Sequence, residues 1–522
     1  MPKGTLSRRR FLGTGSAAGV AAGLAPGART LAQSTKVLRV RAYGAFEILD
    51  PAYYLGRPED DIMRCLCGGL ITAKNGGEWA WEKQFATEIV QESPVRIRFQ
   101  LKTGIPWSDG FGEVTAEDVK FSYERIASPA MKSPYLVDWE KLDRVEVTDT
   151  HSGVILLKEP YMPLWDSTLP TTSGIILCKK AVEKLDGQRF TMTVPAISGP
   201  YRIQKYEPQR SMILERNPLW TGPKPVFDEI HYVTVLDANA AEVGHAAGEF
   251  DYTPQLPAAS VPRLRSNPPA GSHLIVKPSL AFWWLGMQSE DGEFKDVRVR
   301  KAVQLAVDVD AVLEGAFFGA ADRASGIIAP SLIGHRPKNL IENPDREQAK
   351  KLLTEAGYPN GFKTDIGVRN SAEFINAAQV VASNLAQVGI TAEVIPYSGG
   401  VQKAMAGDKN GGWKKMHMHI VRFSMEPDPA WATAWFVTSQ IGEWNWERFS
   451  NKEFDDLQVR AMSEPDRGKR DAMYRRMQDV MEESGSYIFL THGVNAALCR
   501  DAIKPAITPD GSRLDFANFA LA

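Results

Sequence analysis

Two histidines in a short apolar run are the residues whose types and spacing come nearest to a metal site. His417 and His419 are separated by one residue in the run Met416–His419, and imidazoles are common metal ligands. Residues two apart lie on one face of a β-strand, which is the simpler interpretation of this spacing. The sequence offers no third ligand beside them, so we predict neither a metal nor a cofactor.

The cysteines are a second group that could do chemistry: Cys65, Cys67, Cys178 and Cys499. An oxidising compartment permits disulfides, but the sequence cannot choose among the pairings that four cysteines allow. Structural zinc needs four ligands, and no second Cys or His pair stands at a matching spacing from Cys65 and Cys67. We therefore expect isolated buried thiols.

Catalytic signatures are missing from the chain beyond its first 32 residues, which we interpret below as an N-terminal leader. It has no G-x-S-x-G, H-E-x-x-H or P-loop motif, and no dinucleotide-binding fingerprint lies outside the N-terminal leader. Carboxylates are numerous, but their spacing singles out no acid–base pair. We predict that the protein is not an enzyme, with a periplasmic hydrolase as the alternative.

The charge of the chain argues against a nucleic-acid partner. The first 32 residues carry five basic residues and no acid, and the remainder has 56 basic against 63 acidic residues. A mildly acidic chain lacks the basic surface that phosphate backbones select. Its 522 residues exceed what one hydrophobic core usually serves, so at least two lobes are expected.

The N-terminus resembles a twin-arginine export signal. The run Ser7–Gly13 contains three consecutive arginines, and a weakly apolar stretch rich in Ala and Gly follows from Phe11 to Leu24. Small residues in Thr30–Ala32 suit cleavage after Ala32. A membrane anchor is the alternative, but a spanning helix needs about 20 strongly apolar residues. We predict a signal peptide over residues 1–32, export by the twin-arginine route and a periplasmic location.

Local patterns indicate a mixed α/β chain. The run Val95–Leu101 alternates apolar and polar residues, which predicts a strand with one buried face. Thr115 is placed to cap a helix with a buried stripe of Val119, Tyr123 and Ile126. Two further helices are expected: one from Asn343 to about Ala356 with Asn343 as its cap, and one over Asp466–Glu483 with Met473, Met477, Val480 and Met481 inward.

Five blocks of sequence, in order along the chain, resemble the family 5 extracellular solute-binding proteins, the dipeptide, oligopeptide and nickel receptors of ABC importers. Each block alone is a weak signal, but their shared order is specific, and together they span about residues 37 to 500. The blocks are Arg98–Gly110 with Thr115–Tyr123, Ser198–Ile203 with Leu214–Trp220, Asp228–Ile230 with Gly248–Asp251, Phe294–Val303, and Ala306–Asp310.

This resemblance implies an α/β clamp of the periplasmic-binding-protein type, with two lobes of mixed β-sheets flanked by helices. Lobe one would comprise residues 33–74, 191–280 and 485–522, with an extra subdomain inserted at 75–190. Lobe two would comprise 285–484. The chain would cross between the lobes near residues 281–286 and 485–487, and hinge closure would bury a solute between them. The implied partners are a small-molecule solute and the permease subunits of an ABC importer, and we expect a monomer.

Aromatic residues and one arginine are the predicted contacts of that solute. Aromatic rings supply apolar area and can stack on a sugar ring, an amide plane or a cation. Arg422 lies in the stretch Val421–Pro429, which corresponds to the ligand-holding stretch of the peptide receptors. It could bind an anion, or it could pair with Glu426 or Asp428. The full predicted set is Phe46, Trp283, Trp413, Arg422, Phe423, Trp431 and Trp435.

The same stretch departs from the pattern of the peptide receptors. They carry an Asp a few residues before the Asp-Pro step, and it pairs with the free amino terminus of the peptide. This chain has Phe423, Ser424 and Met425 there, and Glu426 is too close to Asp428 to be a safe substitute. We therefore expect unmodified peptides with a free amino terminus to bind weakly. A peptide or peptide-like solute stays the first expectation from the resemblance, with opine-like or sugar-containing solutes as alternatives. A partner-binding sensor or chaperone would instead show large exposed apolar patches.

Overall fold

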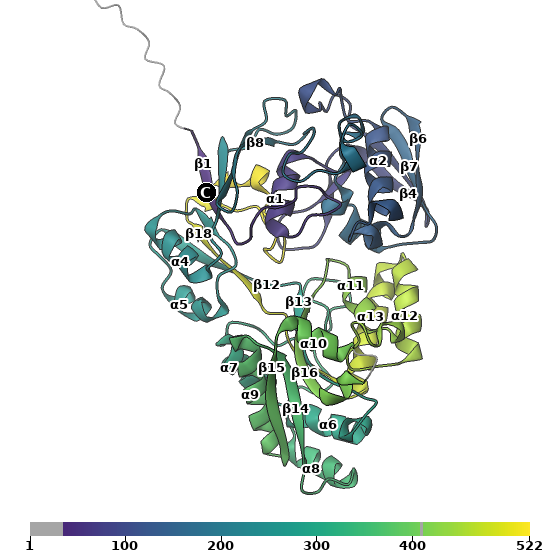
Figure 1. The fold of residues 1–522 in the computed structure, drawn as a ribbon, viewed down its shortest axis with the longest axis vertical. Helices are drawn as coiled ribbons and strands as arrows, with labels where there is room; N and C mark the ends of the chain where they lie inside the picture. The colour runs from purple at the N-terminus through teal and green to yellow at the C-terminus, as the bar shows by residue number, and fades with distance from the viewer. Residues whose placement is uncertain (1–34, 408–410) are drawn as a thin grey trace, which may run out of the picture. The chain divides into compact units, whose positions relative to one another are not determined.

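Three larger β-sheets organise the chain (Figure 1), which we describe from a computed structural model over residues 35–407 and 411–522. The predicted signal peptide lies outside these residues. We call residues 36–278 and 494–522 the seven-stranded region, and residues 281–491 the five-stranded region, after the largest sheet in each. The two regions belong to one unit of the chain, Lys36–Ala522.

The sheet of the seven-stranded region draws its strands from both ends of the chain. Its order is β12-β18-β11-β1-β10-β9-β8, and only the pairs of β1 with β10 and β11 are parallel. Alternate residues of β1, such as Leu38 and Val40, point into the core. The strands are β1 (Val37–Ala42), β8 (Tyr201–Glu207), β9 (Ser211–Arg216), β10 (Glu229–Thr234), β11 (Tyr252–Thr253), β12 (Ser272–Pro278) and β18 (Val494–Arg500).

A separate antiparallel sheet of order β4-β5-β7-β6 forms from residues 86–157. The predicted strand is confirmed as β5 (Arg96–Leu101), whose buried residues are Ile97, Phe99 and Leu101. Helix α2 (Ala116–Ala127) packs on β6 and buries the predicted stripe. Thr115 caps it in a capping box with Asp118, whose side chain accepts from the Thr115 amide at 2.9 Å. The other strands are β4 (Ala86–Ser93), β6 (Leu142–Asp149) and β7 (Ser152–Leu157).

The seven-stranded region also contains several short helices and strands in addition to these two sheets. They include two short antiparallel pairs, β2 with β3 and β19 with β20. Their bounds are α1 (Arg57–Leu66), β2 (Ile71–Ala73), β3 (Trp81–Lys83), α3 (Lys179–Val182), α4 (Ala238–Ala247), α5 (Val261–Ser266), β19 (Ile503–Lys504) and β20 (Ala520–Leu521).

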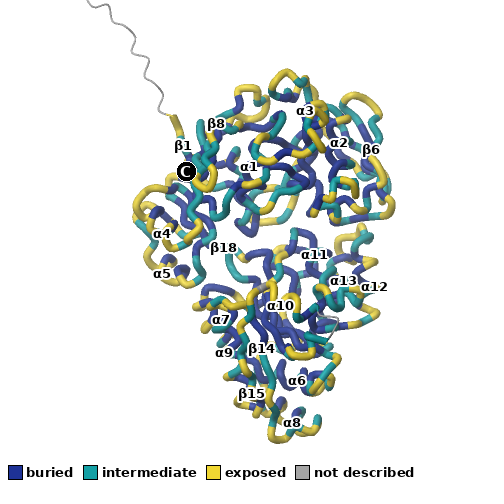
Figure 2. Tube along the Cα trace, in the orientation of Figure 1, coloured by how far each residue is buried: buried dark blue, intermediate teal, exposed yellow. Residues whose placement is uncertain are grey.

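The five-stranded sheet, of order β15-β14-β16-β13-β17, is covered on both faces. Every residue of β13 is buried, and its side chains alternate between two cores: Phe282 and Trp284 on one side, Trp283 and Leu285 on the other. Figure 2 shows buried positions along β14 and exposed ones on α4 and α5. The strands are β13 (Ala281–Met287), β14 (Phe362–Arg369), β15 (Ile390–Tyr397), β16 (Met418–Ser424) and β17 (Tyr487–Thr491).

Helices of the five-stranded region follow the predicted patterns with one correction. The last predicted helix is α13 (Arg467–Glu483), capped by Asp466, with Met477, Val480 and Met481 buried and Met473 partly so. The earlier one, α8 (Arg346–Glu355), is capped by Asp345 rather than Asn343, because the Asp345 carboxylate accepts from the Gln348 amide at 2.9 Å. The others are α6 (Val297–Ala306), α7 (Val309–Phe317), α9 (Ala372–Ala386), α10 (Gly399–Ala406), α11 (Ala430–Thr433) and α12 (Lys452–Ser463).

Two short links join the seven-stranded and five-stranded regions. One runs from β12 to β13 through Ser279 and Leu280, and the other from β17 to β18 through His492 and Gly493. They lie side by side, since the Ser279 hydroxyl donates to the His492 carbonyl at 2.5 Å and His492 Nδ1 lies 2.9 Å from the Ala281 carbonyl. The expected crossings at 281–286 and 485–487 are therefore displaced by a few residues, because β13 and β17 belong to the five-stranded sheet.

Candidate functional site

The segment that follows β16 lies where the two regions meet. Strand pairing sets Arg422 opposite Trp283 and Phe423 opposite Phe282, so the two side chains leave opposite faces of the sheet. The Met425 amide donates to the Leu280 carbonyl at 3.0 Å, which fixes the end of the strand next to one of the links. Beyond Met425 the chain leaves the sheet and runs to α11.

Arg422 makes neither of the ion pairs that were its structural alternative. Its side chain is exposed and forms no salt bridge within the described part of the chain. Partial loss of hydration lowers its pKa and nearby Arg369 adds to this, while Glu373 opposes both. A guanidinium without a fixed partner, next to a second arginine, is chemically suited to bind an anion.

Both acids of the predicted stretch are instead held by other arginines. Asp428 is fully buried and accepts from Arg470 Nη2 through both oxygens, at 2.8 and 2.7 Å. Glu426 accepts from Arg57 Nη2 at 3.1 Å and from Arg513 Nη2 at 2.8 Å. Both carboxylates are therefore paired with arginines in this structure, and neither is free to pair with an ammonium group of a ligand.

Local structure explains why Arg57 and Arg513 meet there. Arg57 is the first residue of α1, where Pro58 favours the helix start and Glu59 accepts from the Gly56 amide at 3.1 Å. Arg513 follows a turn closed by the Gly511 amide donating to the Thr508 carbonyl at 2.8 Å. Gly511 has φ +70°, a left-handed conformation that favours glycine.

An aromatic group surrounds Phe423 on its face of the sheet. The rings of Trp435 and Trp444 lie with their centroids 6.1 and 5.6 Å from that of Phe423 and 5.0 Å from each other. Lys403 Nζ lies 3.8 Å from the centroid of Trp444. Both tryptophans are half-buried, so part of each ring faces solvent. This group can bind a flat or cationic body by stacking.

Three of the remaining four predicted contacts lie apart from this group, whereas Trp431 packs on the same core as Phe423 and Trp435. Phe46 is 2% exposed and packs on Tyr232 in the core of the seven-stranded region. Trp283 is 7% exposed and packs against α7 and α9. Trp413 precedes the start of β16, at the other end of that strand from Phe423, with Arg448 4.2 Å from its ring centroid. Trp431 is half-buried on α11.

Four residues near the meeting of the regions were not predicted: Arg57, Trp79, Trp444 and Arg513. Trp79 comes from the loop between β2 and β3 yet packs on the core of the five-stranded region. Arg57, Trp79 and Arg513 are remote in sequence from Val421–Pro429, so no local pattern connects them to that stretch, whereas Trp444 follows it by 15 residues. Arg57 stands beside acidic residues at the start of a helix, which could have drawn attention to it. Ordinary surface helices begin in the same way, so this pattern does not single Arg57 out.

The histidines and cysteines have structural roles here. His417 pairs with Asp365, and buried His419 lies 2.8 Å from Glu447 Oε1. Among residues 35–407 and 411–522, no three His, Cys, Asp or Glu side chains gather where they could hold a metal ion. All four cysteines are unpaired and buried, which confirms the expectation of isolated thiols.

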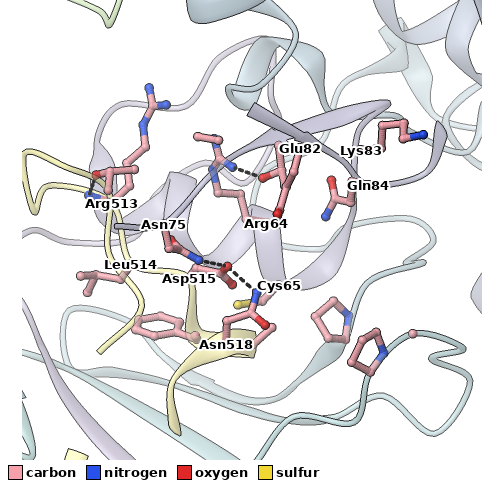
Figure 3. A pocket seen from close by; sticks show the side chains of 18 of the residues that line it. Arg64, Cys65, Asn75, Glu82, Lys83, Gln84, Arg513, Leu514, Asp515 and Asn518 are labelled. Atoms are coloured by element: carbon pink, nitrogen blue, oxygen red, sulfur yellow. Dashed lines mark hydrogen bonds between the residues drawn. The ribbon is translucent and has the colours of Figure 1, made fainter. Parts of the chain in front are cut away.

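A cavity of about 360 Å³ lies within the seven-stranded region, between β2–β3 and the segment 508–518. Figure 3 shows Asn75 and Asn518 pointing to Asp515, and each donates to its carboxylate at 2.7 Å. Arg64, on the same wall, donates to Thr72 Oγ1 at 3.2 Å. The Asp515 carboxylate is thus satisfied by the two asparagines, whereas Arg513, which also lines the cavity, keeps its Nη1 donor without a hydrogen-bond partner in the described part of the chain.

Comparison with known proteins settles the family. Residues 81–443 match the model of the bacterial extracellular solute-binding proteins, family 5 Middle, which is well over half of the chain. The chain belongs to this family. The family 5 proteins are binding proteins rather than an enzyme family, and this membership confirms the resemblance found in the sequence.

Individual family 5 relatives are distant but extensive. The dipeptide-binding protein of Escherichia coli (strain K12) is 24% identical over 458 residues, covering 83% of this chain and 84% of that protein. The glutathione-binding protein GsiB of Shigella dysenteriae serotype 1 (strain Sd197) is 25% identical over 409 residues, covering 76% and 78%. The structure of HbpA2 from Haemophilus parasuis superposes with a TM-score of 0.82 at 20% identity, covering 93% of this chain and all of that one.

This superposition confirms the predicted fold of the periplasmic binding proteins, with mixed sheets and flanking helices. Within residues 35–407 and 411–522, no helix is both long and apolar enough to cross a membrane.

Proposed function

We propose that this family 5 protein is the periplasmic substrate-binding component of an ABC importer, which captures a peptide or peptide-like solute and delivers it to the membrane permease. Family membership carries this proposal, and the names of the dipeptide- and glutathione-binding relatives support the class of solute. In this proposal the seven-stranded region is lobe one, the four-stranded sheet is its inserted subdomain, and the five-stranded region is lobe two. The protein acts as a monomer.

The solute binds where the segment after β16 faces lobe one. Arg422 supplies an anchor for an anion, and Phe423, Trp431 and Trp435 supply apolar surface, extended by Trp444. Phe46, Trp283 and Trp413 are not part of this site, because they pack elsewhere. Opine-like or sugar-containing solutes remain the second candidate, because arginines occupy both acids of the stretch.

Binding is expected to close the two lobes about their two short links. Each link is only two residues long, and Gly493 has φ +67°, so rotation can be confined to a few dihedral angles. Solution scattering should therefore give a smaller radius of gyration with bound solute than without it. A peptide that does not bind by calorimetry is the control. An unchanged radius at saturation would remove closure from the mechanism.

Export is proposed to use the twin-arginine route, with cleavage after Ala32. Guanidinium groups present a planar fork of donors that an ammonium group cannot reproduce, so charge alone should not suffice. Replacing Arg8, Arg9 and Arg10 by Lys should leave the protein in the cytoplasm, as measured by cell fractionation. Arg29→Lys, outside the motif, is the matched control and should be exported normally. Full periplasmic yield of the triple variant would contradict this route.

A further inference from the structure

The carboxylate of Glu426 lies between two arginines from a different part of the chain. Glu426 belongs to the five-stranded region, whereas Arg57 and Arg513 belong to the seven-stranded region. Each carboxylate oxygen meets one guanidinium, with Oε1 3.1 Å from Arg57 Nη2 and Oε2 2.8 Å from Arg513 Nη2. Charge-assisted hydrogen bonds of this kind are among the strong ones that arginine makes to a carboxylate.

The arginines form a site with an excess of positive charge. Arg57, Arg64 and Arg513 all lie within 4 Å of the buried Asp60, at 3.6, 3.0 and 3.4 Å. Neighbouring Asp61 adds little negative charge at neutral pH, because burial and then Asp60 raise its pKa to about 8. Asp510 also raises the pKa of Arg57, but less than Glu426 and Asp60 do. Glu426 is therefore the second acid in direct contact with this group.

One donor of the site is unused. The side chain of Arg513 is 5% exposed, and its Nη1 is buried without a hydrogen-bond partner in the described part of the chain. A buried donor that makes no bond is costly, so an anion that reached it would be bound more tightly. Glu426 does not reach it from its position on the opposite region.

The surroundings favour an anion attached to a flat or apolar body. The rings of Tyr54 and Tyr135 stack with centroids 4.4 Å apart and planes 5° apart, and the Tyr135 hydroxyl donates to the Tyr54 carbonyl at 2.9 Å. Both phenols interact electrostatically with Arg57 and Glu426. Leu55 is 65% exposed next to them.

We propose that Arg57 and Arg513 form a subsite for an anionic group of the solute, and that Glu426 fills this subsite in the structure in place of that group. The proposal rests on the proposed function, since it assigns the chemistry of the solute. Glu426 is suited to such a role because its side chain is 28% exposed and sits on a loop, so it can leave without uncovering a core. The solute class is then one with a carboxylate or phosphate.

The test removes the internal anion and measures binding of a small one. Glu426→Gln should bind acetate about tenfold more tightly than the wild type, as measured by the rise in melting temperature against acetate concentration at constant ionic strength. Inorganic phosphate in a second series distinguishes the two kinds of anion. Glu290→Gln, which breaks the Glu290–Arg448 pair elsewhere, is the matched control and should show no gain.

A second variant assigns the gain to the arginines. Arg57→Gln in the Glu426→Gln background should abolish the gain for acetate. If neither acetate nor phosphate raises the melting temperature of Glu426→Gln more than that of Glu290→Gln, the subsite is refuted. Should Glu426→Gln fail to fold, Arg57→Gln alone should weaken the binding of a carboxylate solute about tenfold and leave the binding of its methyl ester unchanged. Equal effects on the two ligands would refute the subsite. Tight solute binding with no effect of these variants would leave the proposed function standing and remove only the subsite.

Discussion

Asp428→Asn should be among the most destabilising single substitutions in this protein, lowering the free energy of unfolding by about 3–5 kcal/mol. Burial disfavours the charged form of Arg470, but the contact with Asp428 outweighs it and raises the arginine pKa. The substitution leaves a guanidinium that is 4% exposed without its counter-charge. Asparagine can still accept from the Ala430 amide, so the loss comes from the ion pair rather than from this hydrogen bond at the start of α11.

Two further variants separate this effect from a general sensitivity of the region. Asp456→Asn removes the exposed Lys452–Asp456 pair and should change stability by less than about 1 kcal/mol. Asp428→Asn combined with Arg470→Met removes both charges and should recover part of the loss. Urea denaturation of the three variants measures these differences. An Asp428→Asn midpoint equal to that of Asp456→Asn would contradict the assignment of Asp428 and Arg470 as a buried structural pair.

Local elements of the fold could be predicted because their signals lie within a few residues. The alternation in β5, the Thr115 capping box of α2 and the methionine stripe of α13 each depend on neighbours in sequence. The misplaced cap of α8 shows the limit of such signals. Asn343 and Asp345 are both good caps, and only the backbone around Arg346 decides that Asp345 takes the role.

The candidate site was only partly predictable, because its contacts join distant parts of the chain. Phe423 and Trp435 were predicted as aromatic contacts of the solute, and the structure brings their rings together. Glu426 pairs with residues 369 and 87 positions away, a relation that no spacing rule contains. Trp283 lies in a core for a physical reason: a strand buried on both faces places every aromatic residue in a core, and the sequence alone does not show that both faces are covered.

Calorimetry against a panel of matched peptides tests the central claim most directly. Phe423, Ser424 and Met425 stand where an acid would be expected, and buried Asp428 is held by Arg470, so a free ammonium entering the site would find no fixed counter-charge there. Burying an unpaired charge costs several kcal/mol, on the order of a thousandfold in affinity. Unmodified di- to pentapeptides should therefore bind weakly, while N-acetylated peptides with a free carboxylate and sugar–amino-acid conjugates should bind much more tightly.

Each peptide in the panel is compared with its N-acetylated and its C-terminally amidated form, so that one charge changes at a time. The account predicts that acetylation strengthens binding and that amidation weakens it, because Arg422, Arg57 and Arg513 favour an anion. Submicromolar binding of plain peptides, lost on acetylation, would contradict this and indicate an ordinary peptide receptor.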